Sequence, residues 1–93
     1  MKSLKEGLMD AFKIKKQITQ LQGAVVDAYE KLISDNPDKY KRGEDVLNDV
    51  ANFAKESYNK IVTIDGAISF KDWWKTFAPA HVNVLNKTVF AVK

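Results

Sequence analysis

The sequence predicts a small, mainly helical protein in which residues 1–93 form a single domain, and three observations support this prediction. Apolar residues recur at helical spacing through the first third of the chain, and a second stripe of the same kind follows a short polar connector. Four aromatic residues then lie close together near the C-terminus. We expect the first two helices to form an antiparallel hairpin and a short aromatic helix to close a small bundle, with an extended or irregular section at the C-terminus.

The first helix is predicted to run from about residue 4 to residue 33. Its second part carries apolar residues at heptad spacing, which predicts a long contact with a neighbouring helix; they are Ile14, Ile18, Leu21, Val25, Ala28 and Leu32. Gly23 is the expected position of a bend or of a close contact with another helix, because glycine weakens a helix and leaves room beside it.

A polar connector over residues 34–43 ends at Gly43, which we expect to close a short turn. A second helix is predicted over residues 44–59, with Glu44 and Asp45 at its start, where the helix dipole favours negative charge. The residues expected on its inner face are Leu47, Val50, Ala54 and Ile61, flanked by Val46, Phe53 and Tyr58.

The apolar period changes after the second helix. Asp65 and Gly66 stand between β-branched residues and predict a tight turn, with either a two-stranded hairpin or an irregular connection over residues 61–70. Pro79 is expected to end the aromatic helix, because proline disfavours a helical conformation in the residue before it. Residues 82–92 fit either a helix or two short strands. Extended structure is favoured, because the polar side chains scatter around a helix, whereas Val82, Val84, Val89 and Ala91 share a face as strands.

The aromatic helix carries the candidate partner-binding residues. Phe70, Trp73, Trp74 and Phe77 share one helix face through their i, i+3, i+4, i+7 spacing, and Ser69 is expected to cap the helix start. The favoured interpretation is that these rings are core. A second interpretation is a protein-binding surface, because exposed tryptophan is a typical hot-spot residue. Membrane-surface docking is the third and is not expected, because the helix is short.

The N-terminal part of the first helix carries the candidate self-association residues. A second helix of about 16 residues covers only about half of the first, so Leu4, Leu8 and Phe12 need another partner. Either the aromatic helix and the C-terminal segment fold back onto them, or a second subunit covers them as a homodimer.

Nucleic-acid binding is the alternative function. Lys2, Lys5, Lys13 and Lys16 fall near one face of the first helix and would contact phosphates. An ordinary solvated face is the favoured interpretation. The net charge is only +3, and Arg42 is the single arginine, although arginine is preferred for bidentate base and phosphate contacts.

Catalysis, metal binding and cofactor binding are not expected. His81 is the only histidine, the chain has no cysteine, and no glycine-rich phosphate loop occurs. Gly66 stands where a calcium-binding loop has its central glycine, but Ile61 and Thr63 occupy the first ligand positions and cannot supply carboxylates.

These features predict a small, non-enzymatic interaction or regulatory protein that binds another macromolecule, as a monomer or as a homodimer. The sequence has no apolar run of membrane-spanning length and no convincing signal peptide, so we expect a cytoplasmic location. Its size and composition suit an accessory protein of a phage or another mobile element.

Overall fold

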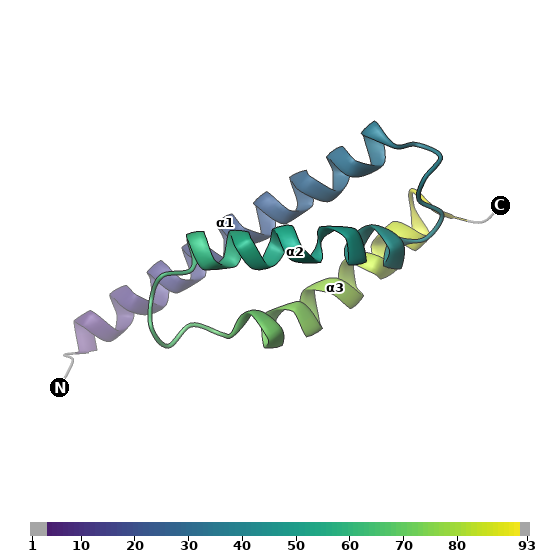
Figure 1. Ribbon diagram of the computed structural model, residues 1–93. Helices are drawn as coiled ribbons and strands as arrows, with labels where there is room; N and C mark the ends of the chain where they lie inside the picture. Colours follow the sequence, from purple (N-terminus) through teal and green to yellow (C-terminus); the bar gives the residue numbers. More distant parts are fainter. Residues whose placement is uncertain (1–3, 92–93) are drawn as a thin grey trace.

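The computed structural model describes the backbone of residues 4–91 and the side chains of residues 11–91. Three helices follow one another, α1 (Leu4–Asp35), α2 (Gly43–Ile61) and α3 (Phe70–Lys87). α2 runs antiparallel to α1, and α3 returns beside α2 (Figure 1). The predicted helical hairpin closed by an aromatic helix is therefore confirmed, and the described residues contain no strand.

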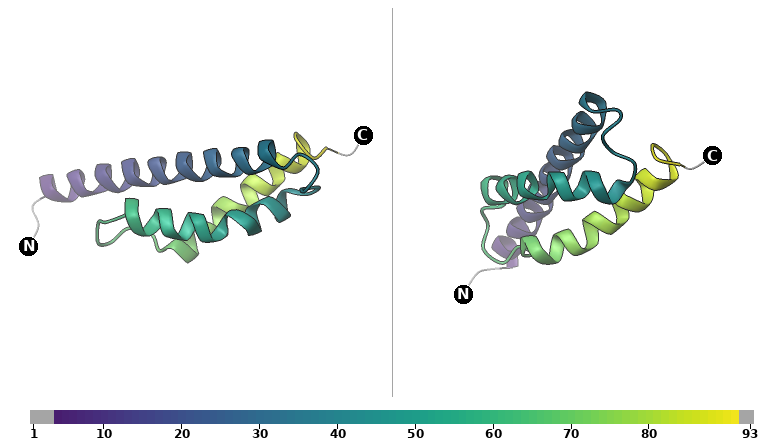
Figure 2. Two further views of the ribbon diagram at one scale, coloured as in Figure 1. Left: turned by 45° about the horizontal axis from the view of Figure 1, so that its top comes forward. Right: turned by 45° about the vertical axis from the view of Figure 1, so that its right-hand side comes forward.

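α1 is longer than the helix that covers it. It has 32 residues, and the described part of the chain measures 56 × 22 × 18 Å. Two hydrogen bonds between Gln17 and Thr63 mark the place where the chain leaves α2, one from the Gln17 amide to Thr63 Oγ1 (3.1 Å) and one from the Thr63 backbone N–H to Gln17 Oε1 (3.2 Å). The N-terminal part of α1 projects beyond this point (Figure 2), as the predicted length mismatch requires.

The core lies between the C-terminal two thirds of α1 and the inner faces of α2 and α3. Burying each large apolar side chain contributes about 1.5–3 kcal/mol relative to leaving it exposed. The predicted heptad of α1 and the predicted inner face of α2 both supply core residues. The buried apolar residues are Leu21, Val25, Tyr29, Tyr40, Val46, Leu47, Val50, Ala54, Trp73, Phe77 and Leu85.

Two predictions about the C-terminal part of the chain are wrong. Pro79 lies inside α3 and does not end it, and residues 82–87 are helical where extended structure was expected. Proline removes the hydrogen bond to the carbonyl of Lys75, but Lys75 and Pro79 are both exposed, so water can satisfy that carbonyl. The irregular C-terminal section is confined to residues 88–91 within the described part.

α3 continues through the proline because packing holds it on both sides. Phe77 precedes Pro79 and Leu85 follows it, and both are buried in the core. The helix face that begins with the four aromatic residues thus continues at helical spacing across the proline and gains two further members. Its residues are Phe70, Trp73, Trp74, Phe77, His81 and Leu85.

The connection between α2 and α3 contains the predicted tight turn but no hairpin of strands. The Ala67 backbone N–H donates to the Ile64 carbonyl at 3.4 Å. Gly66 between them has a φ of 91°, in the left-handed region that favours glycine at the third position of a type II turn.

Gly43 begins α2, whereas the sequence predicted that it would close the preceding turn. A Cβ atom on Gly43 would lie 2.9 Å from the Val82 carbonyl oxygen, so the start of α2 rests directly on the end of α3. Asn86 Oδ1 accepts the Gly43 backbone N–H at 2.8 Å, and Asn86 Nδ2 donates to Glu44 Oε1 at 2.8 Å. Gly23, in contrast, has nothing within 4 Å of its Cβ position, so the expected close contact there is absent within the described fold.

Candidate functional site

The four aromatic candidates lie together, but most of their surface is used inside the fold. Trp73 and Phe77 are only 4% and 5% exposed, and their rings stack with centroids 4.6 Å apart. Phe70 and Trp74 are half-buried and stack at 5.7 Å. Trp73 and Phe77 therefore present almost no surface to a partner, and only the exposed parts of Phe70 and Trp74 are accessible.

The beginning of the aromatic helix follows the predicted capping. Ser69 Oγ accepts the backbone N–H of Asp72 at 3.2 Å, which satisfies one of the free amides at the helix start. Trp73 lies one position further, and its indole N–H is buried without an acceptor among the described protein atoms. An unmade hydrogen bond of this kind costs about 1–3 kcal/mol. The packing of the Trp73 ring therefore has to offset the free-energy cost of burying its unpaired indole N–H.

His81 joins α3 to α1. Its Nδ1 lies 2.9 Å from the Tyr29 hydroxyl, and its ring stacks on Phe77 with centroids 4.0 Å apart. Burial lowers the pKa of His81, and burial together with the nearby Glu30 carboxylate raises the pKa of Tyr29. The neutral forms of both side chains therefore belong to the folded state, and His81 acts as a packing and hydrogen-bonding residue between the two helices.

The free energy of unfolding is expected to decrease as the pH falls below about 6.5, the ordinary pKa of histidine. Because the folded-state pKa of His81 is lowered, the unfolded chain binds a proton more readily across this interval, and protonation favours unfolding. The loss is complete once the pH is below the folded-state pKa. Urea denaturation at pH values from about 7.5 to about 5 measures it. His81→Gln should remove the pH dependence in this interval, and an unchanged slope in that variant would show that other groups cause it.

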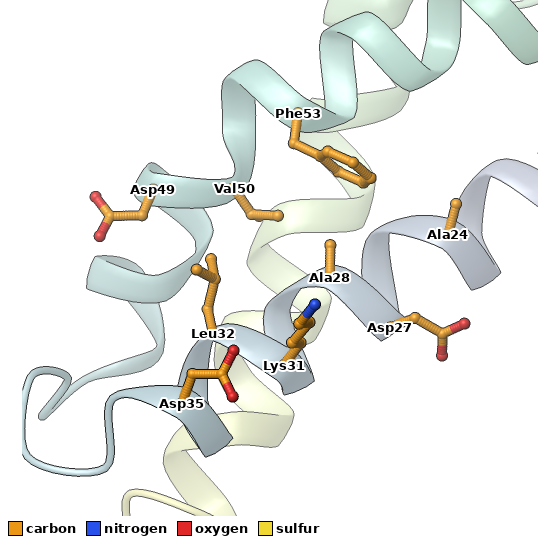
Figure 3. A pocket seen from close by; sticks show the side chains of 9 residues that line it. All are labelled: Ala24, Asp27, Ala28, Lys31, Leu32, Asp35, Asp49, Val50 and Phe53. Atoms are coloured by element: carbon orange, nitrogen blue, oxygen red, sulfur yellow. The ribbon is translucent and has the colours of Figure 1, made fainter.

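A groove that the sequence did not predict lies between α1 and α2 (Figure 3). Its volume is about 570 Å³. Apolar side chains from both helices form its floor, and charged side chains stand at its rim; we call it the α1–α2 groove. The floor consists of Ala24, Ala28, Leu32, Val50 and Phe53, and the rim of Asp27, Lys31, Asp35 and Asp49.

The rim of the α1–α2 groove is acidic, with three carboxylates and one lysine. The Tyr40 hydroxyl donates to Asp49 Oδ2 at 2.8 Å, and Lys39 Nζ lies 3.5 Å from the same oxygen. The Tyr40 hydrogen bond, together with Lys39, lowers the pKa of Asp49. Asp49 therefore stays ionised at neutral pH, and the rim keeps its negative charge.

A second, smaller groove lies between the C-terminal parts of α1 and α3, with a volume of about 390 Å³. We call it the α1–α3 groove. Val84 and Val89 at its edge are 54% and 56% exposed, which is high for valine side chains beside a core. Its lining residues are Tyr29, Glu30, Ile33, Ser34, Val84, Leu85, Thr88 and Val89.

The remaining candidates lie on α1 or outside the described residues. Phe12 is 71% exposed, so no part of the described fold covers it. Lys13 and Lys16 are exposed as well. The side chains of the other predicted residues, Leu4, Leu8, Lys2 and Lys5, lie outside the described part of the chain.

Comparison of the chain with protein-family models, with curated protein sequences and with solved structures gives no match. Over residues 11–91, no three side chains of histidine, aspartate or glutamate converge in the way a metal site requires. None of the described helices combines the length and the apolar character needed to cross a membrane.

Proposed function

We propose that the protein is a non-enzymatic interaction protein of the cytoplasm that binds a short, positively charged amphipathic helix of another protein in its α1–α2 groove. The main support for the proposal is the apolar floor of this groove, where Ala24, Ala28 and Leu32 are half-buried and Phe53 is 45% exposed. An exposed aromatic ring beside a shallow apolar channel is a typical anchor for a protein partner.

The dimensions of the groove favour a helix as the ligand. On α1 the lining residues run from Ala24 to Asp35, a distance of roughly 17 Å at 1.5 Å per residue. This length matches about three turns of a bound helix, which would place apolar anchors at i, i+4 and i+7 on the floor. α3 packs behind the α1–α2 pair (Figure 3), so a helix in the groove would add a fourth element to the bundle.

The charge of the groove rim favours a bound helix of opposite charge. The rim carries Asp27, Asp35 and Asp49 against Lys31 and the Lys39 that pairs with Asp49, so it is still net negative although the whole chain has a net charge of +3. Complementary charges at the edge of an interface steer the encounter and reject ligands of the wrong sign. We therefore expect lysine or arginine beside the apolar anchors of the ligand.

Fluorescence anisotropy with three synthetic peptides of equal length tests the proposal. The first is an amphipathic helix of leucine anchors flanked by lysine, the second has glutamate in place of lysine, and the third is a scrambled isomer of the first. The first should bind, and the other two should bind at least about tenfold more weakly, because they lack the matching charge or the apolar face. Equal binding of all three would contradict the proposal.

Two variants locate the binding. Asp27→Lys reverses a rim charge and should weaken the lysine peptide about fivefold, whereas Asp65→Lys makes the same change in charge in the α2–α3 connection and should have little effect. Ala24→Gln should fill the floor and reduce binding further. Equal effects of Asp27→Lys and Asp65→Lys would mean that overall charge, and not the groove, determines the affinity.

Nucleic-acid binding remains the second candidate. It is supported by the exposure of Lys13 and Lys16 on the projecting part of α1, beyond the region that α2 covers. It predicts an affinity for nucleic acid that falls steeply with salt and is lost when both lysines become glutamate. The small net charge and the single arginine favour the interaction protein.

A further inference from the structure

Charge is divided along the part of α1 that follows residue 10. Residues 11–26 contain three lysines and no carboxylate, whereas residues 27–35 contain three carboxylates and one lysine. The lysines of the basic part are Lys13, Lys15 and Lys16, and the carboxylates of the acidic part are Asp27, Glu30 and Asp35. A second copy laid parallel to α1 would bring like charges together, whereas an antiparallel copy would place each basic part beside an acidic part.

One face of α1 carries accessible side chains along both the basic and the acidic part. Its residues are spaced by three and four positions, which is the geometry of a continuous helix-packing face. Phe12, Lys15, Thr19 and Gln22 of the basic part and Glu30 of the acidic part are exposed on it, whereas Val26 and Ile33 are half-buried. The face consists of Phe12, Lys15, Thr19, Gln22, Val26, Glu30 and Ile33.

The two ends of this face are complementary in shape. Phe12 is 71% exposed at the basic end. At the acidic end the face opens into the α1–α3 groove, where Ile33, Val84 and Val89 form an apolar wall around a volume of about 390 Å³. A phenylalanine side chain is small enough to enter this space, and both surfaces would leave water on contact.

We propose that two copies of the chain form an antiparallel, two-fold symmetric dimer through this face, in which Phe12 of each copy enters the α1–α3 groove of the other. A pairing that sets Phe12 opposite Ile33 of the partner also sets Lys15 opposite Glu30 of the partner, because both pairs are centred near Gln22. Each contact occurs twice, as two-fold symmetry requires. One register therefore satisfies the apolar and the charged positions together.

The dimer face is distinct from the α1–α2 groove. That groove is lined on α1 by Ala24, Ala28 and Leu32, none of which belongs to the dimer face. A dimer would therefore leave both α1–α2 grooves open. Self-association and helix binding can be tested separately, and evidence against one proposal is not evidence against the other.

Sedimentation velocity on the full chain tests the dimer. The wild-type protein should sediment as a dimer at low salt and dissociate more readily at high salt, because the charged pairs are partly screened. Phe12→Ser, Lys15→Glu and Glu30→Lys should each weaken the dimer at least about tenfold. All three positions are exposed, so the variants should keep the wild-type helical content by circular dichroism.

A mixture of two of the defective variants tests whether the two helices are antiparallel in the proposed register. In an antiparallel dimer of Lys15→Glu with Glu30→Lys, each new glutamate faces the other chain's new lysine, and each unchanged Lys15 faces an unchanged Glu30. The mixture should therefore form a heterodimer at concentrations where each variant alone is monomeric. A monomeric wild type at all concentrations, an undiminished dimer of Phe12→Ser, or a mixture that stays monomeric would each overturn the proposal. Binding of the lysine peptide to the same variants should be unchanged. A failure of the dimer proposal can therefore be distinguished from a failure of the proposed binding in the α1–α2 groove.

Discussion

Trp73→Ala is expected to lower the free energy of unfolding by about 3–5 kcal/mol, the usual cost of truncating a buried aromatic side chain. Trp73 is 4% exposed and stacks on Phe77, so the truncation leaves a cavity where α3 meets the core. A domain of this size has a total stability of about 5–15 kcal/mol, so the variant should be close to unfolding at room temperature. Urea denaturation followed by circular dichroism measures the change.

Two matched variants separate packing from chemistry at this position. Trp74→Ala removes the neighbouring, half-buried ring and should cost clearly less. Trp73→Phe keeps an aromatic ring in the stack and removes the indole N–H that has no acceptor, so its cost should be much smaller than that of alanine. A loss for Trp74→Ala as large as that for Trp73→Ala would show that the deeper burial of Trp73 does not determine the cost.

Gly43→Ala is expected to destabilise the fold by about 1–3 kcal/mol, although alanine is normally the better helix former. The added Cβ would meet the Val82 carbonyl oxygen at 2.9 Å and the Leu85 Cβ at 3.2 Å. Relieving these contacts requires α2 and α3 to move apart, which also strains the hydrogen bond from Gly43 to Asn86. Thermal denaturation of the two proteins under identical conditions measures the difference.

Gly23→Ala serves as the control for the glycine at position 43. The Cβ position of Gly23 has nothing within 4 Å, and the residue lies in the middle of α1. The same substitution should therefore stabilise the protein by about 0.5–1 kcal/mol through helix propensity alone. If both substitutions changed stability in the same direction, the close packing between α2 and α3 would not be the cause at Gly43.

The parts of the fold that could be predicted from the sequence are those fixed by local patterns. The heptad from Ile14 to Leu32 gave the packing face of α1, and the Asp65-Gly66 pair gave the turn before α3. The course of α3 beyond Pro79 could not be predicted in this way. It depends on contacts distant in the sequence, such as those of His81 with Tyr29 and of Asn86 with Gly43.

The candidate site shows the same division. The aromatic spacing correctly identified one helix face, but burial depends on how that face meets the other helices, and it places Trp73 and Phe77 in the core. The α1–α2 groove has only a weak sequence signal. Ala24 and Ala28 are small residues four positions apart beside the heptad, and they leave room that Phe53 on α2 only partly fills.

Chemical-shift mapping by NMR, on ¹⁵N-labelled protein titrated with the lysine peptide, shows whether the α1–α2 groove is the binding face. The largest shifts should fall on the backbone amides of the groove, including those of Ala24, Ala28 and Phe53, while Phe70 and Trp74 stay unchanged. Shifts centred on Phe70 and Trp74, or spread evenly over all three helices, would contradict the claim. Shifts centred on Phe70 and Trp74 would indicate that the aromatic helix binds the partner.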